Sequence, residues 1–359
     1  MANSEHYDVI IIGAGPAGSA TAIYINPERS GLRVLLLEGK KEVGVPLQCG
    51  EAMPTYDDLL TVFPKADCRE LFDLPDEVQA GAIEGLKFKA PSGRIYTADL
   101  KGQMYHRDKL DQHLFKRALA CGAEYRLNSR VKKIAKNQVW TSDDTFTADF
   151  IVGADGVFSV VSKAFPAFVP NRDICACAFV LASGDFKENV IQLWYESRFT
   201  GGYFWLFPKS KASEANIGLG VRGRANVRTL LERELQQLSE QGPFLIKYRG
   251  GGAVPLSGLK PKIVSENIAL VGDAAGMVFP TNGGGTGLAM MAGKWLGEII
   301  AKRQALIEYE KKVQAILGPV LKKSLRTRRQ MDLFRKKPSV FSAVMWLANL
   351  KGWRQFIVG

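Results

Sequence analysis

The stretch Tyr7–Ala22, YDVIIIGAGPAGSATA, predicts a buried strand that turns directly into a helix. The run Val9–Ile12 is continuously apolar, which is typical of a parallel strand covered on both faces. Three glycines follow in the spacing G-x-G-x-x-G: Gly13, Gly15 and Gly18. In this motif the first glycine permits a tight turn, the second lets a pyrophosphate approach the backbone, and the third lets the helix pack against the strand.

An acidic residue stands at the matching distance from these glycines. The second predicted strand, Arg33–Leu37, ends in Glu38, twenty residues after Gly18. A carboxylate there can accept hydrogen bonds from an adenosine ribose, while the helix start offers N–H groups and a positive dipole end to an anion. A glycine turn alone also occurs for purely structural reasons. Strand, helix and acid together predict a dinucleotide site, without distinguishing NAD from FAD.

A second glycine-rich motif lies far along the chain and favours FAD. The predicted strand Ile268–Val271 leads into Gly272-Asp273, and the loop Asn282–Gly287, NGGGTG, opens a helix. Reduced flavin carries negative charge near N1, which suits a glycine-rich helix start. Asp273 can accept hydrogen bonds from the ribityl hydroxyls. Because a simple NAD domain needs no such element, the sequence predicts FAD rather than a structural glycine turn.

The composition indicates a globular protein without a disulfide framework. The chain has 359 residues, of which 46% are apolar, and five cysteines without framework spacing. Reduced thiols and the absence of a predicted signal peptide favour the cytoplasm. The apolar stretch Val340–Leu350 is too short to span a bilayer, so we expect a soluble or peripherally attached protein. We expect no metal site.

The net charge of +12 is concentrated near the end of the chain. Residues 302–337 are rich in lysine and arginine, and an aromatic segment, FSAVMWLANLKGWRQF, follows them. Basic residues followed by Trp346, Trp353 and Phe356 are typical of an interfacial anchor on the inner face of the cell membrane. A solvated basic helix followed by a core-packed one explains the pattern equally well. No nucleic-acid motif accompanies the charge, so we expect no nucleic-acid partner.

Between these motifs the chain offers further candidate residues. The irregular loop after Glu38, GKKEVGVPLQCGEAM, contains Cys49 and Gly50 and is expected close to the dinucleotide. Arg107 precedes a predicted helix capped by Asp108 and suits a pyrophosphate, although a solvated surface arginine is the plain alternative. Free cysteine is usually a small buried residue, so the residues alone favour that role for Cys49.

Short strands fill the rest of the chain. Leu86–Ala90 and Arg94–Ala98 predict a hairpin, and Tyr125–Val131 predicts a further strand. Phe146–Val152 predicts a strand that ends in GADG, where Asp155 is a candidate cofactor-binding residue. From Ile174 to Val221 the alternation predicts an antiparallel sheet. Within GGYFWLFP, alternate residues project to one face, where they form core or line a long apolar ligand: Tyr203, Trp205 and Phe207.

These patterns predict an α/β fold with three kinds of part. They are a Rossmann-like FAD-binding domain of the glutathione-reductase type, an antiparallel-sheet substrate domain and a C-terminal helical segment. The FAD domain is expected in residues 1–85, 101–170 and 263–302, the substrate domain in 86–100 and 171–262, and the basic and aromatic helices in 303–359.

Several motifs together carry a resemblance. GAGPAGS, GADG and GDAAGMVFPTNGGGTG resemble the glutathione-reductase-type FAD fold shared with aromatic hydroxylases. PLQCGEAM and GGYFWLFPK are similar to the geranylgeranyl reductase family, whose members saturate double bonds of polyprenyl chains. Thr286 stands where that family more usually has an aliphatic residue. The resemblance implies FAD contacts at Gly18, Glu38, Cys49, Gly50, Ala52, Arg107, Val131, Asp273, Gly285 and Thr286.

The resemblance also implies a reaction. A hydride passes from N5 of reduced FAD to one alkene carbon, and a proton from Cys49, Tyr203 or water reaches the other. The aromatic stripe then lines the site of an isoprenoid lipid or polyprenyl diphosphate. The electron donor stays open among ferredoxin, NADPH and another reduced carrier, because no second dinucleotide fingerprint is present. The alternatives are an FAD monooxygenase of a small aromatic, a quinone side-chain reductase, and a basic membrane-surface or nucleic-acid binding flavoprotein.

Overall fold

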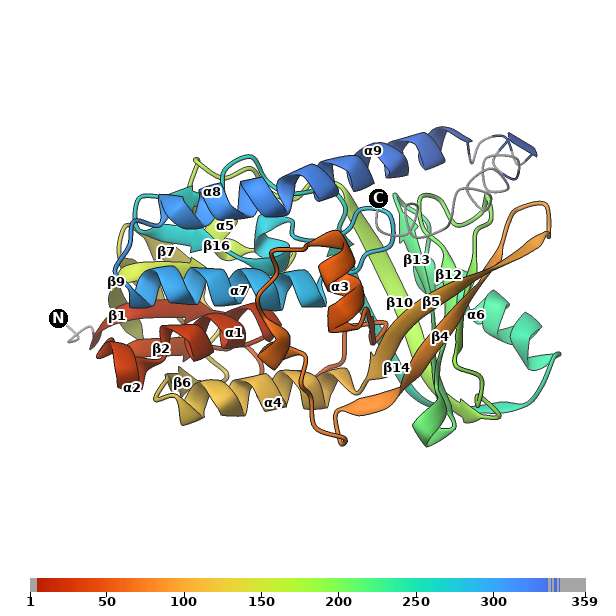
Figure 1. Cartoon of the computed structure of the whole chain (residues 1–359), viewed down its shortest axis with the longest axis horizontal. Coiled ribbons are helices and arrows are strands. Elements are labelled where there is room, and N and C mark those ends of the chain that lie inside the picture. The colour runs from red at the N-terminus through yellow and green to blue at the C-terminus, as the bar shows by residue number, and fades with distance from the viewer. Residues whose placement is uncertain (1–4, 335–336, 338, 341, 343–359) are drawn as a thin grey trace.

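The computed structural model describes residues 5–334, 337, 339–340 and 342, and these residues form two sheets that lie one after the other along the long axis of the molecule (Figure 1). The strands of the first sheet pair in the order β15-β16-β9-β1-β2-β6. Strands β7 and β8 form a hairpin, and β8 also pairs with β9. These strands are β1 (Glu5–Ile12), β2 (Val34–Leu37), β6 (Glu124–Arg126), β7 (Lys133–Ala135), β8 (Gln138–Trp140), β9 (Thr145–Gly153), β15 (Val264–Ser265) and β16 (Ile268–Leu270).

The second sheet has the order β14-β10-β13-β12-β11-β4-β5-β3. Its neighbouring strands are antiparallel except β4 and β11, which are parallel. These strands are β3 (Ala52–Met53), β4 (Gln79–Lys89), β5 (Ile95–Tyr105), β10 (Ile174–Gly184), β11 (Val190–Trp194), β12 (Phe204–Lys209), β13 (Glu214–Arg222) and β14 (Phe244–Pro255).

Helices cover both sheets. They are α1 (Pro16–Ile25), α2 (Pro27–Ser30), α3 (Tyr56–Val62), α4 (Arg107–Ala120), α5 (Val160–Ala164), α6 (Val227–Ser239), α7 (Thr286–Ala301), α8 (Ile307–Ile316) and α9 (Gly318–Phe334), with short 3₁₀ turns at η1 (Arg69–Leu71), η2 (Ser210–Ala212) and η3 (Gly272–Ala275). Helices α1, α4 and α7 lie on the first sheet, and α6 packs on β10 and β13. Helices α1 and α7 both begin at the end of the first sheet that faces the second sheet (Figure 1).

The predicted α/β fold with two sheets and a helical C-terminal segment is therefore confirmed. The four strands β1, β2, β9 and β16 pair with one another in parallel and are largely buried, which explains their continuous apolar runs. Helix α9 connects the two halves of the protein, because Leu321 packs in the core of the first sheet and Met331 in that of the second.

Some local predictions are wrong. Helix α4 begins at Arg107 itself, with His106 and not Asp108 at the N-cap position. The strand expected at Tyr125–Val131 ends at Arg126, because β6 pairs with β2 over only three residues. The β4–β5 hairpin continues beyond 86–100 to Gln79 and Tyr105, because the two strands stay paired with each other across two bulges.

The C-terminal segment is described only in part. In the ranges that the structure describes, no helix combines the length and the apolar character that crossing a bilayer requires. Helices α8 and α9 bury one face and expose most of their basic side chains, although Arg328 of α9 is buried. The expected anchor residues Trp346, Trp353 and Phe356 lie outside the described residues.

Candidate active site

The glycine turn after β1 has the geometry of a dinucleotide-binding turn. Gly13 has φ +103°, and its N–H donates to the carbonyl of Leu37 at 2.8 Å. A Cβ at Gly18 would lie 1.9 Å from the Gly13 oxygen, so the close contact between helix and turn requires glycine there. A Cβ at Gly15 would meet no protein atom within 4 Å. The first and third glycines thus serve the fold, whereas the second borders open space suited to a pyrophosphate.

Glu38 is held at the end of β2, beside this turn. Its Oε2 accepts a hydrogen bond from the Ala14 N–H at 3.0 Å, and its Oε1 accepts one from the Lys40 N–H at 2.9 Å. Each carboxylate oxygen can accept more than one hydrogen bond. The half-buried Glu38 can therefore still receive ribose hydroxyl groups in a fixed position.

Arg107 brings a positive charge to the start of α7. Its Nε lies 2.6 Å from Asp111 Oδ1, and one of its terminal nitrogens donates to Thr286 Oγ1 at 3.3 Å. Burial opposes the charged guanidinium, but Asp111 and Cys49 together outweigh burial and raise the pKa of Arg107. The threonine at 286 has a structural reason here, since an aliphatic side chain could not accept this hydrogen bond.

Asp273 lies behind the glycine-rich loop that opens α7. Burial raises its pKa to about 6, although the charge of Arg107 acts in the opposite direction. A Cβ at Gly285 would lie 3.5 Å from Asp273 Oδ1 and 2.9 Å from a methyl group of Val278. The carboxyl group and the free N–H groups at the start of α7 therefore face the same narrow space.

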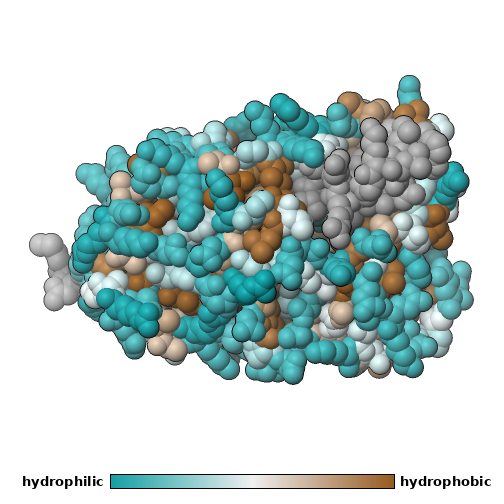
Figure 2. Space-filling model, viewed as in Figure 1, coloured by the Kyte–Doolittle hydropathy of each residue, from teal (hydrophilic) through white to brown (hydrophobic). Residues whose placement is uncertain are grey.

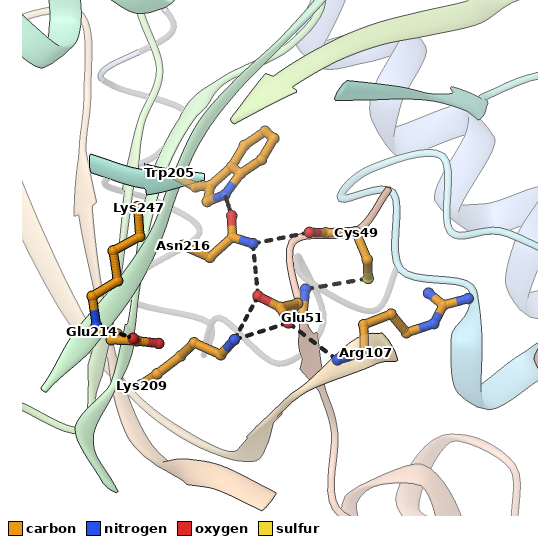
Figure 3. A network of polar contacts seen from close by, with 8 residues as sticks. All are labelled: Cys49, Glu51, Arg107, Trp205, Lys209, Glu214, Asn216 and Lys247. Carbon is orange, nitrogen blue, oxygen red and sulfur yellow. Dashed lines mark hydrogen bonds and ion pairs between the residues drawn. The ribbon is translucent and has the colours of Figure 1, made fainter. Parts of the chain in front are cut away.

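A buried polar network that no motif in the sequence indicates fixes the Cys49 loop (Figure 3). Lys209 Nζ lies 2.9 Å from both carboxylate oxygens of Glu51, and each of these side chains is only 1% exposed. Glu51 also accepts hydrogen bonds from the Asn216 side chain at 3.0 Å and from the Arg107 backbone N–H at 3.1 Å. One carboxylate thus ties the loop to β12, β13 and α4. The sequence gives no spacing signal for such a pairing.

The network also positions Cys49. The thiol sulfur accepts a hydrogen bond from the Glu51 N–H at 3.2 Å, and the Cys49 carbonyl accepts one from the Asn216 side chain at 2.9 Å. Asn216 in turn receives the indole N–H of Trp205 at 2.9 Å. At Gly50 a Cβ would lie 3.3 Å from the Phe207 ring, so the loop backbone packs directly on the aromatic side chains.

The aromatic side chains of the second sheet form the predicted stripe on one face. The ring centroids of Tyr203 and Trp205 are 6.0 Å apart, and those of Trp205 and Phe207 are also 6.0 Å apart. The Tyr203 hydroxyl donates to the carbonyl of Asn282 in the glycine-rich loop. This bond connects the sheet to the start of α7.

A cavity of about 150 Å³ gathers half of the predicted site residues. Its walls come from the Cys49 loop, from strands β10, β12, β13 and β14, and from the start of α7. The predicted residues among its lining are Cys49, Gly50, Ala52, Tyr203, Trp205, Phe207, Gly285 and Thr286.

A larger apolar cavity of about 650 Å³ adjoins the first. The two linings share Ala52, Tyr203, Phe207, Asn282 and Gly284–Thr286. Figure 2 shows apolar side chains near the middle of the visible face, over α3, which forms one wall. The aliphatic and aromatic lining residues include Met53, Leu59, Val62, Phe63, Ile83, Leu86, Leu100, Ile191, Leu193, Phe279, Leu288 and Val320.

Two further predicted cofactor residues, Val131 and Asp155, line neither cavity. The same is true of Gly13, Gly15, Gly18, Glu38, Arg107 and Asp273. Val131 follows β6 and is buried. Asp155 Oδ2 accepts hydrogen bonds from the N–H groups of Val160 at 2.6 Å and Val161 at 3.1 Å, so this carboxylate caps α5. Burial raises the pKa of Asp155. Contacts of these two residues with FAD stay a prediction.

The parts of the site fit FAD. An open turn at Gly15 and a carboxylate at Glu38 that can accept ribose hydroxyls lie at the first sheet. The start of α7 faces the second sheet, with Arg107 and Asp273 beside it. The fold and the site define an FAD-dependent oxidoreductase of the glutathione-reductase type.

The comparisons identify the family. The model of the geranylgeranyl reductase catalytic domain matches residues 173–251, and that of the lycopene cyclase protein matches residues 8–179. Digeranylgeranylglycerophospholipid reductase 1 of Methanopyrus kandleri is 31% identical over 82% of this chain and 80% of its own length. The corresponding reductase of Methanocella arvoryzae is 31% identical over 90% of this chain and 87% of its own. The chain belongs to the geranylgeranyl reductase family.

Solved structures share the fold. A geranylgeranyl bacteriochlorophyll reductase-like protein from Thermoplasma acidophilum has a TM-score of 0.80 at 22% identity, covering 95% of this chain and 91% of its own. A probable FAD-dependent monooxygenase from Pseudomonas aeruginosa has a TM-score of 0.69 at 17% identity, covering 95% of this chain and all of its own. One fold therefore serves both reductases and monooxygenases, so the fold alone does not choose the reaction.

Proposed function

We propose that this enzyme saturates carbon–carbon double bonds in the geranylgeranyl chains of a phosphorylated lipid precursor. The observation that carries the proposal is the apolar cavity of about 650 Å³, which adjoins the smaller cavity at Tyr203, Phe207 and the start of α7. A prenyl chain is long and apolar, and its transfer from water into such a cavity is favourable. The names of the relatives support the same substrate class.

The cofactor would be held at both ends by this chain's own residues. Gly13, Gly15, Gly18 and Glu38 would take the adenosine and pyrophosphate part, and Arg107, Asp273, Gly285 and Thr286 the part near the second sheet. The Cys49 loop, with Gly50 and Ala52, would cover the remaining side. When bound and reduced, FAD supplies a hydride for the double bond.

Cys49 is the proposed proton source for the second alkene carbon. Its sulfur accepts a hydrogen bond from Glu51, which leaves its own hydrogen available toward the cavity. Tyr203 has already engaged its hydroxyl hydrogen with Asn282, so we assign it a positioning role. Trp205 and Phe207 exclude water from the same space. An isolated alkene has no carbonyl to polarise, so placement and water exclusion must lower the barrier.

Cys49→Ser tests the proton role. General acid catalysis typically contributes about 100- to 10,000-fold, so turnover should fall within that range while FAD binding is kept. Cys121→Ser, a half-buried cysteine at the far end of α4, is the matched control and should keep full turnover. Full activity of Cys49→Ser would remove Cys49 from the mechanism.

The substrate class is tested by a direct choice. The purified holoenzyme, kept reduced without oxygen, is offered a geranylgeranylated glycerophospholipid, geranylgeranyl diphosphate, a prenylated quinone and a simple phenol. The proposal predicts a gain of two hydrogen atoms per double bond in a geranylgeranyl compound. Saturation of the quinone side chain alone would contradict the proposal and indicate a quinone side-chain reductase. Hydroxylation of the phenol once oxygen is admitted would instead indicate a monooxygenase.

For the electron donor, we propose a reduced carrier that reaches the flavin only transiently, either NADPH or a ferredoxin-type protein. The net charge of +12 supports an acidic carrier protein, since complementary charge speeds encounter. Anaerobic flavin reduction should then be faster with a reduced acidic carrier than with NADPH, and should slow as salt is added. The opposite order would favour the nucleotide.

We also propose peripheral binding to an anionic membrane. Helix α9 exposes Lys322, Arg326 and Arg329, and lysine or arginine near such a surface contributes about 1 kcal/mol each. Flotation with vesicles that contain an anionic phospholipid should carry the enzyme upward, and vesicles of neutral phospholipid should not. Equal flotation with both would contradict an electrostatic contact.

A further inference from the structure

The apolar cavity has few charged residues in its lining: Asp58, Lys101 and Lys323. Asp58 belongs to the start of α3, where its Oδ2 accepts a hydrogen bond from the Thr55 hydroxyl at 2.7 Å. The backbone N–H of Asp58 donates to Thr55 Oγ1 at 3.2 Å. The carboxylate therefore has a structural role. The two lysines form no ion pair within the described part of the chain.

The backbone of β5 directs Lys101 toward this cavity. Ile83 pairs with Gly102 and Gly85 with Asp99, so that Leu100 and Lys101 together stand opposite the single residue Glu84. Two residues against one form a β-bulge, and bulges redirect side chains near functional sites. In a regular strand only alternate residues would face one side. Here Leu100, Lys101 and Gly102 all line the cavity in succession.

Lys323 reaches the same cavity from α9. It follows Pro319 and Val320 at the spacing of one helix turn, and all three residues line the cavity. Both Lys101 and Lys323 are exposed, whereas the lining near Phe63 and Leu288 is buried. The lysines therefore lie at the mouth, where an apolar interior meets solvent.

We propose that Lys101 and Lys323 bind the phosphate group of a phosphorylated prenyl substrate at the mouth of the apolar cavity. The inference rests on the proposed function and deepens it, because it assigns a site to the polar end of the substrate. Lysine is a compact charge suited to phosphate, and two of them on separate elements can contact one phosphate group. The held phosphate fixes how deeply the prenyl chain enters, and hence which double bonds reach the region of Tyr203.

The test compares substrates that share a chain and differ in charge. Lys101→Ala, Lys323→Ala and the double variant are assayed with geranylgeranyl diphosphate, with digeranylgeranylglyceryl phosphate and with neutral geranylgeraniol. Lys262→Ala, an exposed lysine outside the cavity, is the matched control. Each cavity variant should raise KM for the two phosphorylated substrates about three- to fivefold, and the double variant roughly tenfold, as expected for exposed ion pairs. KM for geranylgeraniol and all constants of the control should stay unchanged.

The outcomes separate the two proposals. If the wild-type enzyme saturates none of the three compounds, the proposed function fails. If the wild type saturates them, two results would contradict the phosphate site alone. One is a KM of the double variant that rises as much for geranylgeraniol as for the phosphorylated compounds, and the other is a KM that does not rise for any of them. Inorganic pyrophosphate should compete with substrate in the wild type and roughly tenfold less well in the double variant. The phosphorylated compound whose KM rises more in the double variant indicates whether the natural phosphate group belongs to a diphosphate or to a glycerophospholipid.

Discussion

Lys209 Nζ lies 2.9 Å from both carboxylate oxygens of Glu51, and the two side chains are completely enclosed. Glu51 is not a glycine, yet it has φ +67°, a conformation that is costly for a residue with a Cβ. The ion pair and the hydrogen bond to Asn216 hold this conformation. The buried ion pair of Glu51 and Lys209 therefore fixes the position of the loop that contains Cys49.

Removal of one partner of the Glu51–Lys209 ion pair should strongly destabilise the fold. Lys209→Met leaves an unpaired buried carboxylate, and loss of one half of a buried pair costs about 3 to 5 kcal/mol of unfolding free energy. Urea unfolding measures this cost. Lys247→Met is the control, because Lys247 pairs with Glu214 at 2.7 Å near the surface and should cost under about 1 kcal/mol. Equal losses in the two variants would contradict the role of the buried pair.

Gly15→Ala should weaken FAD without damage to the fold. The added Cβ meets no protein atom within 4 Å and occupies the space assigned to the pyrophosphate. We expect the Kd for FAD to rise at least about tenfold, which corresponds to about 1.4 kcal/mol. Gly242→Ala, where a Cβ also meets open space, should leave the Kd unchanged. Unaltered FAD affinity in Gly15→Ala would place the pyrophosphate elsewhere.

Asp273 should make the stability of the FAD-free protein depend on pH. Its folded pKa is raised from 3.8 to about 6 by burial, so the folded state is penalised as the carboxyl group ionises. The penalty is absent below about pH 4, grows up to about pH 6 and is complete above it. Between pH 4 and 7 the unfolding free energy of Asp273→Asn should therefore rise by about 1 to 3 kcal/mol relative to that of the wild type. Asp143→Asn, at an exposed position, is the control and should show no such trend. A stability difference between Asp273→Asn and the wild type that does not change with pH would refute the prediction.

A larger side chain in the apolar cavity should block the prenyl chain alone. Val62→Trp places an indole from α3 into the lining of this cavity, outside the smaller one. We expect loss of prenyl saturation, while FAD binding and the reaction of the reduced flavin with oxygen continue. Ile95→Trp, at an exposed position of β5, should retain saturation. Undiminished saturation in Val62→Trp would show that the chain binds elsewhere.

Local spacing explains which parts of this protein could be predicted from its sequence. The turn at Gly13, Gly15 and Gly18, the carboxylate of Glu38 and the aromatic face of β12 all depend on neighbours a few residues apart. The pair of Glu51 and Lys209 joins residues 158 positions apart, and no periodicity connects them. The bulge at Lys101 likewise depends on the register with β4, which alternation in a single strand does not reveal. The predicted β4–β5 hairpin is too short for the same reason, because the two strands stay paired across bulges that interrupt their alternation.

The most direct test of the central claim is a single turnover without oxygen. The flavin of the purified holoenzyme is reduced with dithionite, a geranylgeranylated glycerophospholipid is added, and the flavin absorbance is followed together with the mass of the lipid. The account predicts that the flavin is reoxidised and that one double bond gains two hydrogen atoms for each flavin oxidised. A flavin that stays reduced until oxygen is admitted, with the lipid unchanged, would contradict it.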